Sequence, residues 1–210
     1  GLKMVKTFYV MRHGQTRFNL QGRIQGACDS PLTELGIEQA KSARQHFKEE
    51  GITFTRVYSS TQERAYDTAE LVTERTDYIR LKGLKEMDFG SYEVHQEYLN
   101  PPLHREDGSG YRDYFVAYGD ESNVQVYERM AKTIREVLEQ SSDEDQLLFV
   151  SHGAAITQFY RHATLNPPVP KKRLENCAIF KMTYDGKDIM VQSIYNPIEK
   201  EYIFERKEND

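Results

Sequence analysis

Hydrophobic and polar positions follow two different periods along the chain, and together they predict an α/β fold. Residues 5–11 and 146–150 form short, almost uninterrupted apolar runs, which are typical of strands covered on both faces. Longer segments between them carry apolar residues every three to four positions, as amphipathic helices do. Because strands that alternate with helices form βαβ units, we expect a mainly parallel sheet with helices on both faces.

Several polar residues are predicted to begin helices. Thr33 has the chemistry of an N-cap ahead of the helix that follows it. Ser60 with Glu63, and Ser122 with Gln125, have the spacing of a capping box. The other expected elements are strands at 54–58 and 78–81, a helix at 154–165, and a hairpin from 177–184 to 189–195 that turns at Asp185-Gly186.

The stretch between the third strand and the long helix after Ser122 departs from this pattern. It contains prolines and glycines in close succession and then a group of aromatic residues. We therefore predict a single domain over residues 4–210 with a cap insertion at about 92–122. The aromatic side chains fit two roles equally well, lining a substrate entrance or forming the core of the cap: Tyr111, Tyr114, Phe115 and Tyr118.

Composition narrows the class of protein. With 29% charged and 38% hydrophobic residues, the chain of 210 residues has the balance of a soluble globular domain. Its net charge of -5 argues against a nucleic-acid partner. No apolar run approaches the ~20 residues that span a bilayer, and no signal-peptide pattern opens the chain. Two cysteines, Cys28 and Cys177, make no disulfide framework, so we expect a cytoplasmic protein with free thiols.

Three predicted strands end in similar chemistry. The first ends at Arg12-His13, the second leads to Arg64, and the most apolar one ends at Ser151-His152. Ligands of open α/β sheets bind beyond the carboxyl ends of the strands, so these side chains are expected at one edge. Two guanidinium groups suit a tetrahedral oxyanion with several charged oxygens, which points to phosphate. An isolated Arg-His-Gly sequence, by contrast, is equally consistent with a structural histidine whose hydrogen bonds are all made within the core.

Two histidines in a phosphate pocket suggest phosphoryl transfer to one of them. Neutral imidazole can attack phosphorus, while the second ring donates to the equatorial oxygens. A leaving alkoxide needs a proton, and Glu86 is the candidate acid, although its local sequence also fits a surface glutamate. No metal is expected, because the remaining histidines lack the spacing of metal ligands: His46, His95, His104 and His162.

These motifs together resemble the histidine phosphatase superfamily, in its phosphoglycerate mutase-like branch. The resemblance covers roughly residues 5–165 and rests on a series of motifs in the same order: Arg12-His13-Gly14-Gln15-Thr16 with Asn19, Gly22 to Gly26, Asp29 to Thr33, Tyr58-Ser59-Ser60 with Arg64 and Thr68, Glu86 with Phe89-Gly90, and Val150 to Gly153. It implies a three-layer α/β/α sandwich and a small phosphorylated substrate, with no metal or other cofactor.

The resemblance also implies roles for individual residues. His13 is expected to be the phosphorylated nucleophile and Glu86 the proton donor and acceptor. The expected phosphate ligands are Arg12, Arg64 and His152. The other residues expected to bind substrate are Asn19, Gln25, Gly26 and Gly153.

The sequence departs from the family pattern after the acidic residue. Phosphatases that it resembles often carry Trp-Glu-Gly there, whereas this chain has Tyr92-Glu93-Val94, so we expect its cap to begin differently. Residues 87–93 contain two acids and no Lys or Arg, and we expect them to repel a substrate carboxylate or second phosphate. This favours a phosphomonoester hydrolase. The alternatives are a cofactor-dependent phosphoglycerate mutase and a non-catalytic protein that binds phosphorylated ligands.

Overall fold

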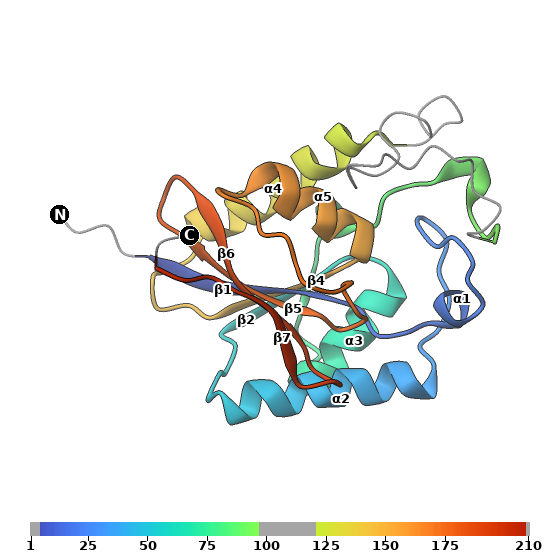
Figure 1. Cartoon of the computed structure of the whole chain (residues 1–210), viewed down its shortest axis with the longest axis horizontal. Coiled ribbons are helices and arrows are strands. Elements are labelled where there is room, and N and C mark those ends of the chain that lie inside the picture. Colours follow the sequence, from blue (N-terminus) through green and yellow to red (C-terminus); the bar gives the residue numbers. More distant parts are fainter. Residues whose placement is uncertain (1–4, 97–120, 209–210) are drawn as a thin grey trace.

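The computed structural model, which describes residues 5–96 and 121–208, contains a seven-stranded sheet between two layers of helices (Figure 1). The strands lie in the order β3-β2-β4-β1-β5-β6-β7. Their bounds are β1 Lys6–Arg12, β2 Arg56–Ser59, β3 Ile79–Arg80, β4 Leu147–Ser151, β5 Ile179–Tyr184, β6 Ile189–Asn196 and β7 Glu201–Glu205.

Five α-helices and two short 3₁₀ helices connect the strands in these described ranges. Their bounds are α1 Arg17–Leu20, α2 Glu34–Glu49, α3 Glu63–Thr73, α4 Asn123–Gln140 and α5 Gly153–Ala163, with η1 Lys82–Leu84 and η2 Gly90–Tyr92. Within the described part of the chain, no helix combines the length and the apolar character that a membrane crossing needs.

The sheet has a parallel half and an antiparallel half that meet at β1. Strands β3, β2, β4 and β1 pair in parallel, with Val10 of β1 opposite Phe149 of β4. On its other side β1 pairs with β5 in antiparallel register, and β6 and β7 continue that arrangement. The predicted α/β fold is confirmed, and the sheet is mixed, being parallel only in these first four strands.

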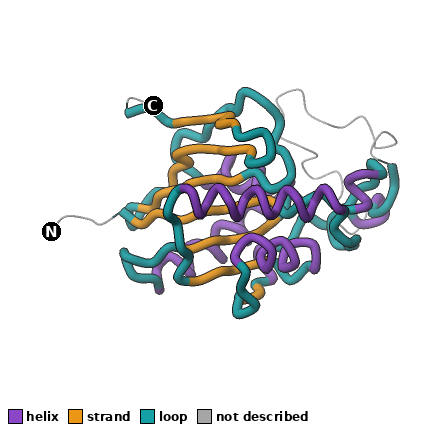
Figure 2. Tube along the Cα trace, turned by 90° about the horizontal axis from the view of Figure 1, so that it is seen from below, coloured by secondary structure: helices purple, strands orange, loops and turns teal. Residues whose placement is uncertain are grey.

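Helices cover both faces of the sheet, which explains the unbroken apolar runs. Along β1, Phe8 and Val10 face the layer of α4 and α5, whereas Tyr9 and Met11 face the layer of α2 and α3. Figure 1 shows these two layers above and below the sheet, and in Figure 2, seen from below, α2 and α3 lie in front of the strands. A strand buried on both faces has no solvent side, so period-2 alternation disappears.

Two of the three predicted helix starts are confirmed. The Thr33 hydroxyl accepts a hydrogen bond from the Gly36 N–H at the start of α2. At the start of α4, Ser122 and Gln125 exchange the two side-chain to backbone bonds of a capping box. The box predicted at Ser60 is wrong, because α3 begins without a side-chain cap and the Ser60 hydroxyl has partners in the site described below.

The last strand, β7, was not predicted from the sequence. It lies at the edge of the sheet, and Ile203 is its one buried residue. A strand with so little buried surface leaves almost no hydrophobic pattern. The predicted hairpin before it is confirmed, with Gly186 at φ 92° in its turn.

The predicted cap insertion falls largely outside the described residues. Of its range, the structure describes residues 92–96 and 121–122, which include the end of η2 and the N-cap of α4. The four aromatic residues assigned to the cap also lie outside the described ranges: Tyr111, Tyr114, Phe115 and Tyr118.

Candidate active site

The polar residues that follow β1, β2 and β4 lie at one edge of the sheet, because these strands are parallel neighbours. Strands β2, β4 and β1 are neighbours, and Arg12 at the end of β1 stands opposite Ser151 at the end of β4. His13 and His152 are the next residues along these two strands. Their ring centroids lie 5.2 Å apart. The two histidines expected from the sequence therefore share one site.

His13 is held with one ring nitrogen facing the backbone. Its Nδ1 lies 2.7 Å from the carbonyl oxygen of Gly14, which can only accept, so Nδ1 carries the proton of the neutral ring. Burial lowers the pKa of His13 well below its ordinary 6.5, and the nearby Arg64 and Arg12 lower this pKa further. A neutral ring protonated at Nδ1 has its lone pair at Nε2. Such an imidazole is a nucleophile in a fixed orientation.

Gly14 is required by packing rather than by a ligand. A Cβ atom at this position would lie 2.5 Å from the carbonyl oxygen of Gly36, in the first turn of α2. The Gly14 N–H donates to Thr68 Oγ1 at 3.0 Å on α3. The absence of a side chain at this position lets two helices approach the end of β1.

His152 is fully buried and is oriented by Ser60. Its Nε2 lies 2.8 Å from Ser60 Oγ, which also accepts a bond from the Gln62 N–H. Nδ1 of His152 is buried and has no hydrogen-bond partner among the described residues. Burial lowers the pKa of His152 well below its ordinary value, and Arg64 adds to the shift. With the Ser60 hydroxyl donating to Nε2, the neutral ring carries its proton on Nδ1 and can donate it to an anion.

Glu86 is buried at the N-terminus of α5, so its reading as a surface glutamate is wrong. Its Oε1 accepts hydrogen bonds from the N–H groups of Met87 and Ala155, both at 2.8 Å, and its Oε2 accepts one from Ala154 at 3.0 Å. Burial raises the pKa of Glu86, and these bonds oppose but do not cancel the shift. A buried carboxyl with a raised pKa holds its proton to higher pH, as a general acid must.

Arg12 lies over the first residue of α5. Its Nη1 donates to the carbonyl of Leu174 at 3.2 Å. A Cβ atom at position 153 would come within 3.1 Å of Arg12 Nε, so Gly153 makes room for the guanidinium. Arg12 is thus held between the carbonyl of Leu174 and the first residue of α5.

Arg64 is buried, and its two terminal nitrogens are occupied by the loop after α1. Nη1 bonds to the carbonyl of Cys28 at 2.7 Å and to Asp29 Oδ1 at 2.9 Å, and Nη2 bonds to the carbonyl of Gly26 at 2.8 Å. Only Nε has no partner among the described residues. Arg64 thus anchors the loop and supplies positive potential to both histidines.

A cavity of about 190 Å³ lies where these groups meet. Six of the predicted site residues line it: Arg12, His13, Asn19, Gln25, Glu86 and Gly153. Arg64, His152 and Gly26 are not among its described lining residues. Gly26 donates its N–H to Glu93 and accepts bonds from Arg64 and Gln62, so its backbone holds the loop instead of facing the cavity. The described residues contain no cluster of three or more His, Cys, Asp or Glu side chains arranged to hold a metal ion.

The sequence and the fold both match a known family. Residues 8–197 match the histidine phosphatase superfamily (branch 1). The chain belongs to this family. It is 34% identical over 186 residues to a probable phosphoglycerate mutase, GpmB, of Proteus mirabilis, with 85% of each chain covered.

Solved structures of the family include both mutases and phosphatases. A phosphoglycerate mutase from Bacillus anthracis aligns with a TM-score of 0.77 and 26% identity, covering 90% of this chain and 92% of that one. A phosphoserine phosphatase variant from Entamoeba histolytica, in complex with phosphoserine, aligns with a TM-score of 0.72 and 27% identity, covering 90% and 96%. The resemblance inferred from the motifs is confirmed.

Three residues at or beside the candidate site of this chain were not predicted. Asn176 donates from Nδ2 to the carbonyl of His13 at 3.2 Å. Gln62 bridges two parts of the site, because its Nε2 donates to Gly26 and its Oε1 accepts from the Glu86 N–H. Arg23 lines the 190 Å³ cavity. Arg23 lies within a motif quoted for the family, whereas no local signal marks Asn176, which is 163 residues from His13.

The departure from the family's Trp-Glu-Gly pattern has a structural counterpart. Glu93 accepts N–H bonds from Gly26 and Cys28, both at 2.9 Å, and from Phe89 at 2.8 Å. Val94 has φ 72°, a left-handed conformation that favours glycine and strains a β-branched residue. The backbone at position 94 therefore has a glycine-like conformation although the glycine is missing.

Proposed function

We propose that this chain is a phosphomonoester hydrolase that acts on a small phosphorylated metabolite through a phosphohistidine at His13. The observation that carries the proposal is the hydrogen bond from His13 Nδ1 to the Gly14 carbonyl, which leaves the Nε2 lone pair for phosphorus. Glu86, the candidate acid, lines the same cavity.

The first step transfers the phosphoryl group to His13. Nε2 attacks phosphorus, the ester P–O bond breaks, and its electron pair leaves on the ester oxygen, which takes a proton from Glu86. Arg12 and the Nδ1–H of His152 stabilise the charge that spreads over the equatorial oxygens.

The second step returns the enzyme to its starting state. Water attacks phosphorus and gives a proton to the Glu86 carboxylate. The P–N bond breaks, its electron pair returns to Nε2, and inorganic phosphate leaves. Glu86 thus acts first as acid and then as base, and the sum of both steps is hydrolysis of the ester.

Access of water favours hydrolysis over transfer to a second substrate. A mutase must keep water from the phosphohistidine, which a basic closing segment after the acid would favour. Residues 87–96 supply no Lys or Arg, and Glu93 within them is bound to backbone amides. The catalytic cavity also adjoins a wider one of about 780 Å³, which offers a path for water. The name of the Proteus mirabilis relative keeps a phosphoglycerate mutase as the second candidate.

Rapid quenching without acid, using a ³²P-labelled monoester, tests the covalent step. We expect the label on His13, and label on a serine, on Cys28 or on His152 would overturn the assignment. In parallel, phosphate release is compared with interconversion of 2- and 3-phosphoglycerate in the presence of bisphosphoglycerate. We expect phosphate release to be the faster reaction, and the opposite order would select the mutase.

A further inference from the structure

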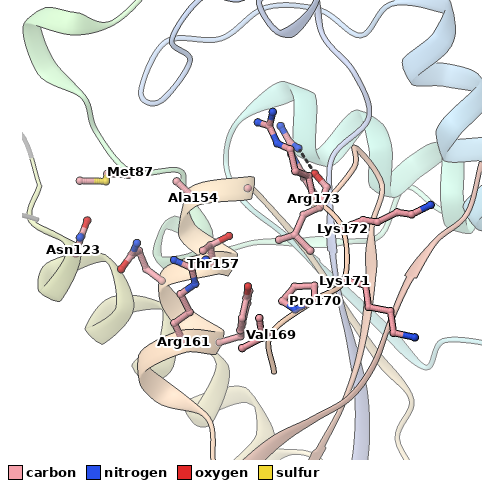
Figure 3. Close-up of a pocket in the computed structure, with 15 residues that line it drawn as sticks. Met87, Asn123, Ala154, Thr157, Arg161, Val169, Pro170, Lys171, Lys172 and Arg173 are labelled. Atoms are coloured by element: carbon pink, nitrogen blue, oxygen red, sulfur yellow. Dashed lines mark hydrogen bonds between the residues drawn. The ribbon is translucent and has the colours of Figure 1, made fainter. Parts of the chain in front are cut away.

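A second cavity, of about 780 Å³, continues from the catalytic one. Arg12, Gly153 and Ala154 line both cavities, so the two are adjacent. The wider cavity lies between α5 and the loop at 169–174, as Figure 3 shows. Whatever is esterified to a phosphate at His13 has this space to extend into.

One face of α5 forms a wall of this cavity. Ala154, Thr157 and Arg161 are spaced by three and four residues, which places them on one helix face. At 1.5 Å per residue, Arg161 lies about 10 Å along the helix axis from Ala154. Helical side chains lean toward the N-terminus, and Figure 3 shows Arg161 extending toward Thr157. The arginine therefore points back along the wall toward the catalytic end.

The cavity is basic although the chain is acidic overall. Its described lining residues include five cations and no Asp or Glu: Arg12, Arg161, Lys171, Lys172 and Arg173. Lys172 is paired with Glu201 at 2.8 Å. Figure 3 shows both Lys171 and Lys172 extending away from α5. Arg161 is the cation that α5 itself directs along the wall.

Arg161 has unused hydrogen-bonding capacity. Its Nη1 is buried, yet it has no hydrogen-bond partner among the described residues. A buried donor without an acceptor is costly, and most such groups in proteins are paired. A guanidinium fork matches the oxygens of a carboxylate or a phosphate.

We propose that Arg161 binds a second anionic group, a carboxylate or a second phosphate, on the substrate. The substrate class is then a phosphomonoester with another acid a few bonds from the ester oxygen. This inference rests on the proposed function, because it takes the scissile phosphate to be bound at His13. The acids after Glu86 do not oppose it. Asp88 accepts a bond from the Gly90 N–H, Glu93 is bound to backbone amides, and Arg161 comes from a different element.

Three substrates of equal chain length test the proposal: propyl phosphate, 3-(phosphonooxy)propanoate and propane-1,3-diol bisphosphate. We expect the wild-type protein to prefer the two substrates with a second anion. Arg161→Met should lower kcat/KM for those two about 10- to 100-fold more than for propyl phosphate, mainly through KM. Of the carboxylate and the bisphosphate substrate, the one whose kcat/KM falls further in Arg161→Met carries the group that Arg161 prefers.

Two further variants separate recognition from general charge and from folding. Lys41→Met removes an exposed cation from α2 that lines neither cavity, and should change kcat/KM for all three substrates less than about twofold. Arg161→Lys keeps the charge but loses the fork, and should recover part of the loss. Equal losses of Arg161→Met on all three substrates, or no loss on any, would overturn the subsite.

Binding measurements keep this test separate from the proposed hydrolysis. In a His13→Ala background, calorimetry with the bisphosphate compares Arg161 with Arg161→Met. Weaker binding by about 10-fold or more supports the subsite even if no substrate releases phosphate, in which case the proposed function alone fails. Unchanged binding would contradict the proposed subsite without contradicting the proposed chemistry at His13.

Discussion

The proposed catalytic end and the basic end of the combined cavity differ in how their key side chains are held. Nδ1 of His152 and Nε of Arg64 are buried without a partner among the described residues at the catalytic end too, so the comparison concerns the two groups proposed to react there. At the catalytic end, His13 and Glu86 are bound to backbone groups, through one bond to Gly14 and three bonds from Met87, Ala154 and Ala155. At the basic end, Nη1 of Arg161 is buried with no partner among the described residues.

This difference separates chemistry from recognition. Groups that react must already be oriented when the substrate arrives, because reorienting them during the reaction raises the barrier. A group that selects a substrate must keep hydrogen-bonding capacity for the ligand. Changes at the catalytic end should therefore affect every phosphomonoester, whereas changes at the basic end should affect only those with a second anion.

The largest effect is expected at His13. His13→Ala removes the nucleophile and should lower kcat on all three propyl substrates to a similar extent, by on the order of 10⁴- to 10⁶-fold. Steady-state phosphate release measures the loss, and circular dichroism checks the fold. If the variant kept more than a few per cent of the activity on any of the three, His13 would not be the nucleophile.

Glu86 should show a loss that depends on the leaving group. Glu86→Gln keeps the shape of the side chain but removes the transferable proton, so hydrolysis of propyl phosphate should slow by about 10²- to 10⁴-fold. Nitrophenyl phosphate, whose leaving group needs little protonation, should be affected much less. A similar slowing on both substrates would mean that Glu86 serves a purpose other than protonation.

The pKa shifts at the catalytic end predict the pH dependence of kcat/KM. His13 must be neutral, and because its pKa is lowered from 6.5, the acid limb should fall below that value. Glu86 must be protonated, and because its pKa is raised from 4.5, the alkaline limb should lie above that value. Activity is thus highest between the two limbs, and Glu86→Gln should abolish the alkaline one. An alkaline limb that persists unchanged in this variant would assign it to another group.

The smallest effect concerns the strained turn that leads away from the catalytic end. Val94→Gly relieves a left-handed conformation at a position that is only partly buried, and should raise the free energy of unfolding by about 1 kcal/mol. Val94→Ala is the matched control, because alanine is still strained at this φ. Thermal melting compares both with the wild type. Equal melting temperatures for the glycine and alanine variants would show that backbone strain at residue 94 does not lower the stability of the fold.

The proposed catalytic end could be located from the sequence because it depends on strand order and local motifs. The apolar runs at residues 5–11 and 146–150 identified two neighbouring strands, and a histidine follows each run after one intervening residue. In a parallel sheet the carboxyl ends of neighbouring strands lie together, so the meeting of His13 and His152 could be predicted. Glu86 was proposed from the proton that a leaving alkoxide needs and then from the family resemblance, but its burial against α5 leaves no local signal.

Only the tertiary structure decided how individual polar atoms are used. Ser60 has the spacing of a helix cap, but its hydroxyl bonds to His152, 92 residues away. Gly14 directly follows His13 in the motif, but the atoms that exclude a side chain there belong to Gly36, in a different segment. The role proposed for Arg161 depends on the loop at 169–174, which lines the same cavity as α5. Pattern and spacing determine which elements form and which ends meet, whereas a hydrogen bond of about 3 Å depends on packing between segments far apart in the chain.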